Sequence, residues 1–314
     1  MAEIVDDTPA REAAAAAASG GSGITMVDEG AVVKTTAPFQ FEFDEGRKFA
    51  SFADRDNAEN LAKWGIPVNV MQGLHFRFDE TFRRGMAEEF LCALFNSAAF
   101  RGAFQLADGR GGSTAFCGPA RVTKVKHTPL LCSHTTLDLF DRVMNDEIVR
   151  KASGAVCKMA DVFLPRGVTV ADQLRGVFML GEDSEYYDTF SETEQSEFLY
   201  HVMWRLVAGG ALNQYEDDFS VYKNVCRDVY RDLVSVARVD AGGAGDVEGG
   251  GGSGLAVQSL VYQVHAAAGS DGLEVPLFPV DDESRNGNHN FMYVSIHPTR
   301  RACTVWYNGF WSPF

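Results

Sequence analysis

Residues 191–222 read SETEQSEFLYHVMWRLVAGGALNQYEDDFSVY and define the architecture expected for the middle of the chain. Ser191 and Glu194 form an S-x-x-E capping box, which is typical of a helix N-terminus. Gly209 or Gly210 suits a left-handed C-cap, a conformation that other residues resist. Apolar residues recur at helical spacing on both sides of the glycines, so we expect two helices that form a hairpin. The predicted stripes are Phe198, Leu199, Val202, Met203 and Leu206 before the turn, and Tyr222, Val225, Val229, Leu233 and Val236 after it.

The segments before and after this hairpin favour strands. FQFEF (39–43) and LHFRF (74–78) alternate apolar and polar residues, which is typical of half-buried strands. Residues 114–127 are expected to form one or two strands, and AVQSLVYQVHA (256–266) another. Residues 291–308 predict a hairpin that turns at HPTR, with Met292, Val294 and Ile296 on one face and Cys303, Val305 and Tyr307 across from them.

Further helices are expected between the strands. Asp79 is the predicted N-cap of a helix whose stripe contains Phe82, Met86, Phe90 and Leu94. Helical spacing of Leu137, Phe140, Val143 and Met144 predicts a helix over 134–163, and Thr169 is the predicted cap of the next helix. The order of these elements predicts an α+β fold, in which the helices are segregated from an antiparallel or mixed sheet.

Composition divides the chain into four parts. Residues 1–36 include an alanine run that ends in Gly and Ser, and we expect a disordered Ala/Gly-rich tail. Residues 37–239 form the expected α+β core with the helical hairpin. Residues 240–254 (DAGGAGDVEGGGGSG) are the expected flexible linker or loop insertion. Residues 255–314 form a β-rich C-terminal part, which we expect to complete the same domain.

Charge and hydrophobic patterning exclude several classes of partner and location. The 314-residue chain has a formal net charge of −15 and a sequence pI of about 4.9, so nucleic acid is not an expected partner. The most apolar run, 198–212, is interrupted by His201 and Arg205, so no membrane span is predicted. The N-terminus has acids where a signal peptide has basic residues. We therefore expect the protein in the cytoplasm.

The six cysteines predict packing residues in a reducing compartment. No C-x-x-C pair occurs, and most cysteines stand among apolar residues. The motifs of P-loops, nucleophile elbows, zincins and calcium loops are also missing. We therefore predict no cofactor, metal or catalytic residues. The cysteines are Cys92, Cys117, Cys132, Cys157, Cys226 and Cys303.

The acidic corner of the hairpin, residues 214–218 (QYEDD), allows more than one interpretation. Glu216, Asp217 and Asp218 are suited to acid–base chemistry or to a hard cation. Acids ahead of a helix also stabilise its positive N-terminal end, and this explanation is favoured. Capping explains Gln214 and Tyr215 less well. We therefore predict a protein-binding surface that includes Gln214, Tyr215, Glu216 and Asp217.

Two other stretches are candidate contact surfaces. RVTKVKH (121–127) is compact and basic; it either meets an acidic partner or, as favoured here, is an edge strand whose lysines oppose unwanted pairing. The aromatic residues of VWYNGFWSPF (305–314) either anchor an interface or complete the sheet, and the sequence leaves both options open. Trp306 and Trp311 are therefore candidate protein-binding residues.

An ordered set of segments resembles the cilia- and flagella-associated protein 300 family. Near the N-terminus these are PFQFEF (38–43) and FRFDETF (76–82), followed by NDEIVR (145–150) and HPTRRACTVWY (297–307). The Ala-rich tail and the Gly-rich insertion depart from the family pattern, and the final residues match less clearly. In the middle, the matching pieces are Glu182–Glu185, Glu197–Leu199, Gly209–Leu212, Gln214–Asp217 and Asp232–Val236.

This resemblance implies a non-enzymatic protein of motile cilia or flagella. The family is needed to build outer and inner axonemal dynein arms, as a cytoplasmic assembly factor or as an adaptor for intraflagellar transport. The implied partners are dynein-arm assembly factors or axonemal dynein subunits, with the transport machinery as a further expected partner. The implied location is the cytoplasm and the cilium. The alternatives are a stable structural component of the axoneme and, less favoured, an enzyme that uses Glu216–Asp218.

Overall fold

The architecture is that of a computed structural model, which describes residues 39–68, 70–107, 112–116, 121–164, 168–208, 215–239, 254–278 and 290–309. Residues 37–314 form one compact unit. The predicted tail, almost all of the linker, Gly209, Gly210, Gln214 and Trp311 lie outside the described residues. Within the described part, no helix is long and apolar enough to cross a membrane.

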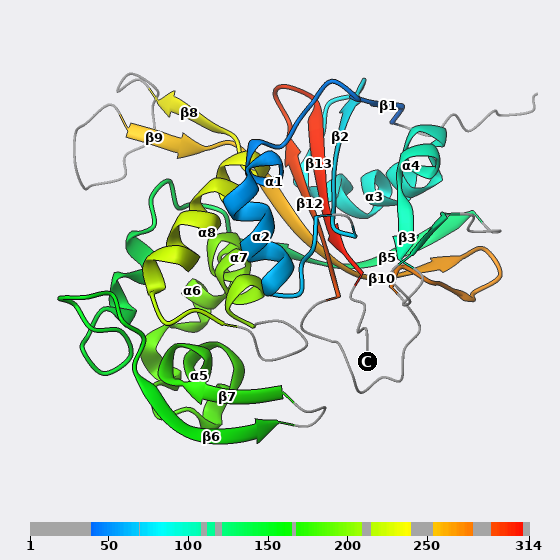
Figure 1. Ribbon diagram of the computed structural model, residues 1–314. Coiled ribbons are helices and arrows are strands. Elements are labelled where there is room, and N and C mark those ends of the chain that lie inside the picture. The colour runs from blue at the N-terminus through cyan, green and yellow to red at the C-terminus, as the bar shows by residue number, and fades with distance from the viewer. Residues whose placement is uncertain are drawn as a thin grey trace, which may run out of the picture. The chain divides into compact units, whose positions relative to one another are not determined.

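A seven-stranded antiparallel sheet lies at the centre of the described residues (Figure 1). Its strand order is β1-β2-β13-β12-β10, with β5 on one edge of β10 and the short β11 also paired with β10. The strands are β1 (Phe41–Phe43), β2 (Gln72–Phe78), β5 (Val122–Leu130), β10 (Leu260–Gly269), β11 (Glu274–Val275), β12 (Phe291–His297) and β13 (Ala302–Asn308). The predicted C-terminal hairpin is confirmed and occupies the centre of the sheet, where Val294 pairs with Val305.

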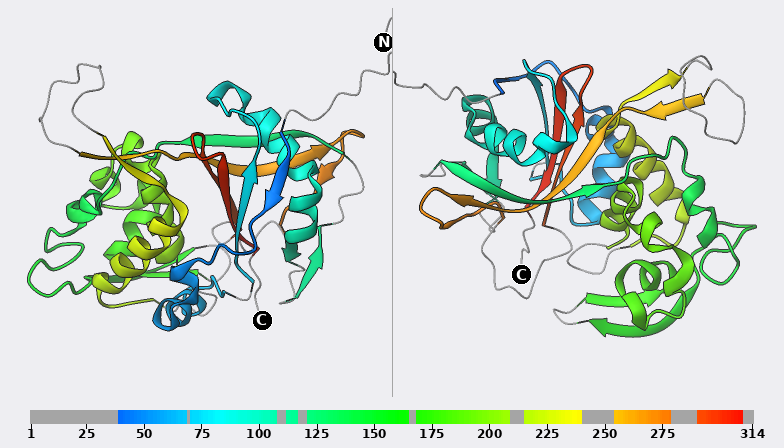
Figure 2. Two further views of the ribbon diagram at one scale, coloured as in Figure 1. Left: turned by 90° about the horizontal axis from the view of Figure 1, so that it is seen from above. Right: turned by 180° about the vertical axis from the view of Figure 1, so that it is seen from behind.

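Helices α3 (Ala87–Asn96) and α4 (Ala98–Ala103) cover one face of this sheet (Figure 2). Alternate residues of β2, β12 and β13 point into the core beneath them, as the sequence predicted. Asp79 does not cap the predicted helix, because its carboxylate accepts a hydrogen bond from the Gln40 backbone N–H instead. A 3-10 turn (Arg84–Met86) precedes the helix.

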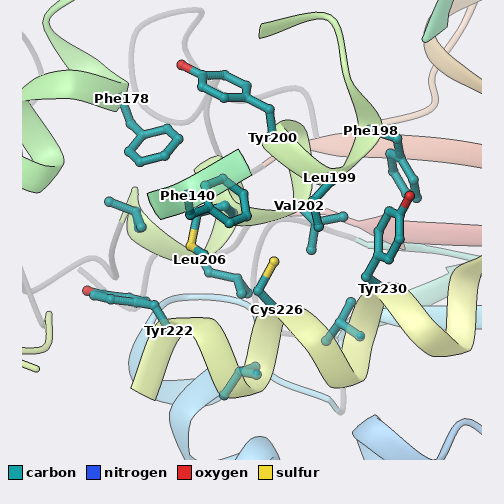
Figure 3. Packing of buried hydrophobic residues seen from close by; sticks show 14 of the residues in the cluster. Phe140, Phe178, Phe198, Leu199, Tyr200, Val202, Leu206, Tyr222, Cys226 and Tyr230 are labelled. Atoms are coloured by element: carbon teal, nitrogen blue, oxygen red, sulfur yellow. The ribbon is translucent and has the colours of Figure 1, made fainter. Parts of the chain in front are cut away.

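The opposite face packs against a larger helical layer (Figures 1 and 2). The predicted helical hairpin is confirmed as α7 (Phe198–Val207) and α8 (Phe219–Leu233), whose apolar stripes meet in the core (Figure 3). The capping box at Ser191 is also present, but it starts a separate short helix. The other helices of this layer are α1 (Ala50–Ala53), α2 (Arg55–Lys63), α5 (Gln173–Met179) and α6 (Glu192–Gln195).

The prediction of a helix over 134–163 is wrong. Only a 3-10 helix forms there, over Asp138–Val143. The Asn145 side chain then accepts hydrogen bonds from the backbone of Glu147 and Ile148, at 3.0 and 2.8 Å. Such side-chain bonds compete with helical ones, so the chain turns away. Leu139, Phe140 and Val143 are buried nonetheless.

The remaining strands form small two-stranded hairpins. Strand β7 occupies the position predicted for a helix start at Thr169, and the actual N-cap of α5 is Asp172, which accepts from the Arg175 N–H. Residues 168–170 are three consecutive β-branched residues, which suit a strand, so the helix starts later in the chain. Two additional 3-10 turns are Gly181–Asp183 and Tyr187–Thr189. The hairpins pair β3 (Gln105–Ala107) with β4 (Ser113–Ala115), β6 (Lys158–Leu164) with β7 (Val168–Asp172), and β8 (Val236–Val239) with β9 (Gly254–Val257).

Candidate functional site

The acidic corner lies between α7 and α8, and its described residues are Tyr215–Asp218. Glu216 faces helix α2: its Oε1 accepts from Lys63 Nζ at 2.5 Å and from Trp64 Nε1 at 3.3 Å. The Glu216 backbone N–H donates to the Tyr222 hydroxyl at 3.0 Å. The Glu216 side chain is only 16% exposed. These contacts connect α2 to the start of α8.

Asp217 and Asp218 connect the corner to the loop before β6. The Asp217 carboxylate forms an ion pair with Lys158, and its backbone carbonyl accepts from the Val156 N–H at 2.8 Å. Asp218 is the N-cap of α8, since its side chain accepts from the Ser220 N–H at 2.8 Å. This confirms the capping interpretation for Asp218. The Asp217 side chain remains 80% exposed, so it is far more accessible than that of Glu216.

Gly154 permits the loop to approach the cap closely. Its φ is +74°, a conformation that L side chains rarely adopt. A Cβ at this position would lie 3.1 Å from Asp218 Oδ1. The Gly154 carbonyl also accepts a hydrogen bond from the Phe219 N–H at 3.0 Å. The glycine therefore allows the loop and the first turn of α8 to pack together.

The ring of Tyr215 contacts two cations. Lys158 Nζ is 4.9 Å and Arg175 Cζ is 5.0 Å from the centre of its ring, which is within cation–π range. Arg175 is 1% exposed, and its guanidinium donates to the carbonyls of Thr169 at 2.6 Å and Ala208 at 3.0 Å. The second bond satisfies a carbonyl at the C-terminal end of α7, where intrahelical partners end. Arg175 thereby fixes the end of α7 beneath Tyr215.

Asp172 accompanies this arginine below the surface. It is 1% exposed, and burial raises its pKa, while the Arg175 N–H bond and the charges of Arg175 and Lys158 oppose the shift. Burial lowers the pKa of Arg175, and the Asp172 charge acts against that change. Asp172 Oδ2 and Arg175 Nε have no hydrogen-bond partner among the described residues. Burying both charges carries a high desolvation cost. Arg175 connects α5 to the corner through the Tyr215 ring and the Ala208 carbonyl.

The structure describes three of the four corner residues that were predicted to bind a partner. The structure brings Tyr215, Glu216 and Asp217 together, while Gln214 lies outside the described residues. Sequence reasoning missed Lys63, Trp64, Lys158, Asp172 and Arg175. One signal was available, because Arg175 is the single charged residue in the apolar run LRGVFML (174–180).

Trp306 is a core residue, contrary to its suggested role at an interface. It has no exposed area, and its Nε1 donates to Met71 Sδ at 3.0 Å. Its ring packs against Phe291 with 4.5 Å between centroids. A central strand of a sheet covered on both faces has no outward side, which is why this aromatic residue is buried. Trp311 lies outside the described residues.

Four cysteines of the described residues have thiols that stay protonated at neutral pH. Burial raises the pKa of Cys92 to about 11 and that of Cys132 to about 12. It also raises the pKa of the fully buried Cys226 and Cys303. The thiolate is the nucleophilic form, so these four cysteines act as packing residues. The described residues also contain no group of three His, Cys, Asp or Glu side chains placed to hold a metal ion.

Comparison with known proteins identifies the family. A sequence model of the family "Cilia- and flagella-associated protein 300" matches residues 38–308. A Chlamydomonas reinhardtii protein of that name is 29% identical over 252 residues, which cover 80% of this chain and 90% of the relative. A Paramecium tetraurelia protein of the same name is 29% identical, covering 80% of this chain and 86% of that relative. No solved structure matches. The chain therefore belongs to the cilia- and flagella-associated protein 300 family, as the resemblance indicated.

Proposed function

We propose that this protein is a non-enzymatic component of ciliated or flagellated cells that acts in the assembly of outer and inner axonemal dynein arms. It works as a cytoplasmic assembly factor, as an adaptor for intraflagellar transport, or as both. The observation that supports this most is the family match over residues 38–308, which includes the segments whose resemblance implied the role. Cytoplasm and cilium are the corresponding locations.

The contacts of the acidic corner favour a structural use of its carboxylates over a catalytic one. Glu216 has a cation and an indole as partners, Asp217 has Lys158, and Asp218 caps a helix. Carboxylates engaged in this way hold secondary-structure elements together. In the proposed role, Tyr215 and Asp217 supply the accessible part of a partner surface, and the partners are dynein-arm assembly factors, dynein subunits or the transport machinery.

The decisive experiment removes the protein from ciliated cells and measures axonemal dynein heavy chains separately in cytoplasm and in isolated cilia. Depletion from cilia with a normal cytoplasmic pool is expected for an adaptor. Depletion from both is expected for an assembly factor. Normal amounts in both compartments would contradict the proposal.

A stable structural component of the axoneme is the rival function, and extraction separates the two. Isolated cilia are treated with detergent and then with high salt, and this protein is followed in each fraction. An assembly factor or adaptor leaves with the soluble matrix. A protein that stays with the salt-extracted microtubules would be part of the axoneme instead.

A further inference from the structure

Strand β5 contains the compact basic stretch of the chain and forms an edge of the main sheet. Among the described residues it pairs with β10 alone. Lys124 and Lys126 are exposed, and neither forms an ion pair with any described residue. This is unusual surface for a protein whose formal net charge is −15.

The register places both lysines on the face opposite α3. Lys124 lies across from Ala268 and Lys126 across from Ala266, whereas the intervening pair of Val125 and Ala267 is buried in the core. Side chains alternate between the faces of a strand, so the lysines and these alanines share the other face.

The helical layer does not cover this end of that face. Val261, at the start of β10, is buried in the helical core, but Ala266 and Ala268 are only partly buried. His265 is exposed, and its Nε2 lies 2.9 Å from Thr128 Oγ1. We name this surface the basic face; its residues are Lys124, Lys126, Thr128, His265, Ala266 and Ala268.

The local field on the basic face is positive. The pKa of His265 is lowered, first by partial burial and then by the positive charges of Lys126, Arg205 and His127. The one described acid that the register brings to this face is Glu274, which pairs with Ala268 from the far side of β10. The lysines therefore remain available to carboxylates from outside the chain.

We propose that the basic face docks a short acidic segment of a partner protein. Lysine ammonium groups attract its carboxylates. The small alanines beside them on β10 let an extended chain approach the sheet closely. The Debye length is about 8 Å at physiological salt, so a short segment interacts mainly with the nearby lysines rather than with the net charge. A nucleic acid is longer and would also meet the net charge of the chain, which is −15 and repels phosphates. The proposal rests on exposure and charge alone and is independent of the role in dynein-arm assembly.

The test uses the full-length protein and a fluorescein-labelled peptide of ten glutamates, with binding followed by fluorescence anisotropy. The Lys124→Glu/Lys126→Glu variant is expected to bind roughly tenfold more weakly, because two attractive pairs become repulsive. The matched control is Arg55→Glu/Arg231→Glu, which makes the same charge change at exposed positions on α2 and α8 and should retain binding. Affinity should also fall as salt rises.

Charge reversal separates docking from the protection that lysines give to an edge strand, because glutamates also oppose edge pairing. If protection were the only role, the wild-type protein would not bind the peptide. That result would overturn the proposal, as would equal loss in the control or tighter binding of a ten-nucleotide single-stranded DNA. Thermal unfolding checks that the charge-reversal variant folds. If it does not fold, the Lys124→Gln/Lys126→Gln variant takes its place and must bind the peptide more weakly than the wild-type protein, by a smaller factor.

Discussion

Adjacent acids in the corner have different energetic roles at the scale of single residues. Glu216 is mostly buried and accepts from both Lys63 and Trp64, whereas Asp217 is 80% exposed and meets one lysine. Exposed ion pairs contribute little to stability, because solvent screens them and ordering long side chains costs entropy. Removing the acceptor of a buried indole N–H leaves that donor without a partner, which is more costly.

Glu216→Ala should therefore lower the free energy of unfolding by about 1–3 kcal/mol. Asp217→Ala, its matched control, should change it by less than about 1 kcal/mol. Denaturant unfolding of both variants measures the difference. If Glu216→Ala also changed the free energy of unfolding by less than about 1 kcal/mol, the contacts of Glu216 would not stabilise the fold. The corner would then be open to a pure binding role.

Short helices depend on their tertiary contacts at the scale of secondary-structure elements. Helix α1 has four residues, too few to be stable in isolation. Asp232, near the end of α8, accepts from both the backbone N–H and the hydroxyl of Ser51 at 2.7 Å. Ser51 is 2% exposed, so water does not replace this partner. The carboxylate therefore anchors α1 on the helical hairpin.

Asp232→Ala should detach α1 and lower the free energy of unfolding by about 2–3 kcal/mol, because a buried donor pair loses a charged acceptor. Asp228→Ala, one turn earlier on the same helix, is the control. Asp228 accepts a long hydrogen bond of 3.4 Å from Asn57, so its removal should lower the free energy of unfolding by less. Hydrogen exchange of the α1 amides reports the effect directly. Unchanged protection of Ser51 in Asp232→Ala would refute the anchoring role.

Proton binding affects the stability of the whole molecule. The pKa values of His75, His201, His265 and His297 are all lowered, with burial as the largest cause. The pKa of His201 is lowered to about 4, and the charges of Arg205 and His265 add to the effect of burial. A lowered histidine pKa means that the unfolded chain binds more protons, so acid favours unfolding.

The free energy of unfolding should thus decrease as pH falls from about 6.5 towards 4, by up to roughly 1.4 kcal/mol per pH unit from His201 alone. His201→Gln, which does not titrate, should give a shallower dependence in this window. The two proteins should show the same dependence between pH 7 and 9. Denaturant titrations at each pH measure this, and an identical acid slope in both proteins would contradict the predicted role of His201.

Local patterns in the sequence determined the elements whose signals are short-ranged. The alternation in FQFEF and LHFRF was sufficient to predict strands, and the apolar stripe was sufficient to predict α8 as far as Leu233, because periodicity depends on neighbouring residues. The capping box at Ser191 marked a helix start correctly, but the helix that it starts ends at Gln195, before α7 begins. The α+β class and the C-terminal hairpin followed from the same signals. The helix expected over 134–163 failed because the Asn145 side chain bonds to the backbone, which apolar spacing does not reveal.

Only the tertiary structure decided what the corner residues contact and where Trp306 lies. Lys63 and Glu216 are 153 positions apart, and Lys158 and Asp217 are 59 apart, so no local pattern relates them. The sequence left open whether Trp306 anchors an interface or completes the sheet, and the structure decides for the sheet, since β13 lies between β2 and β12 with both faces covered. The physical reason is the same in each case: long-range packing sets burial and charge pairing, and a sequence pattern records only what lies within a few residues along the chain.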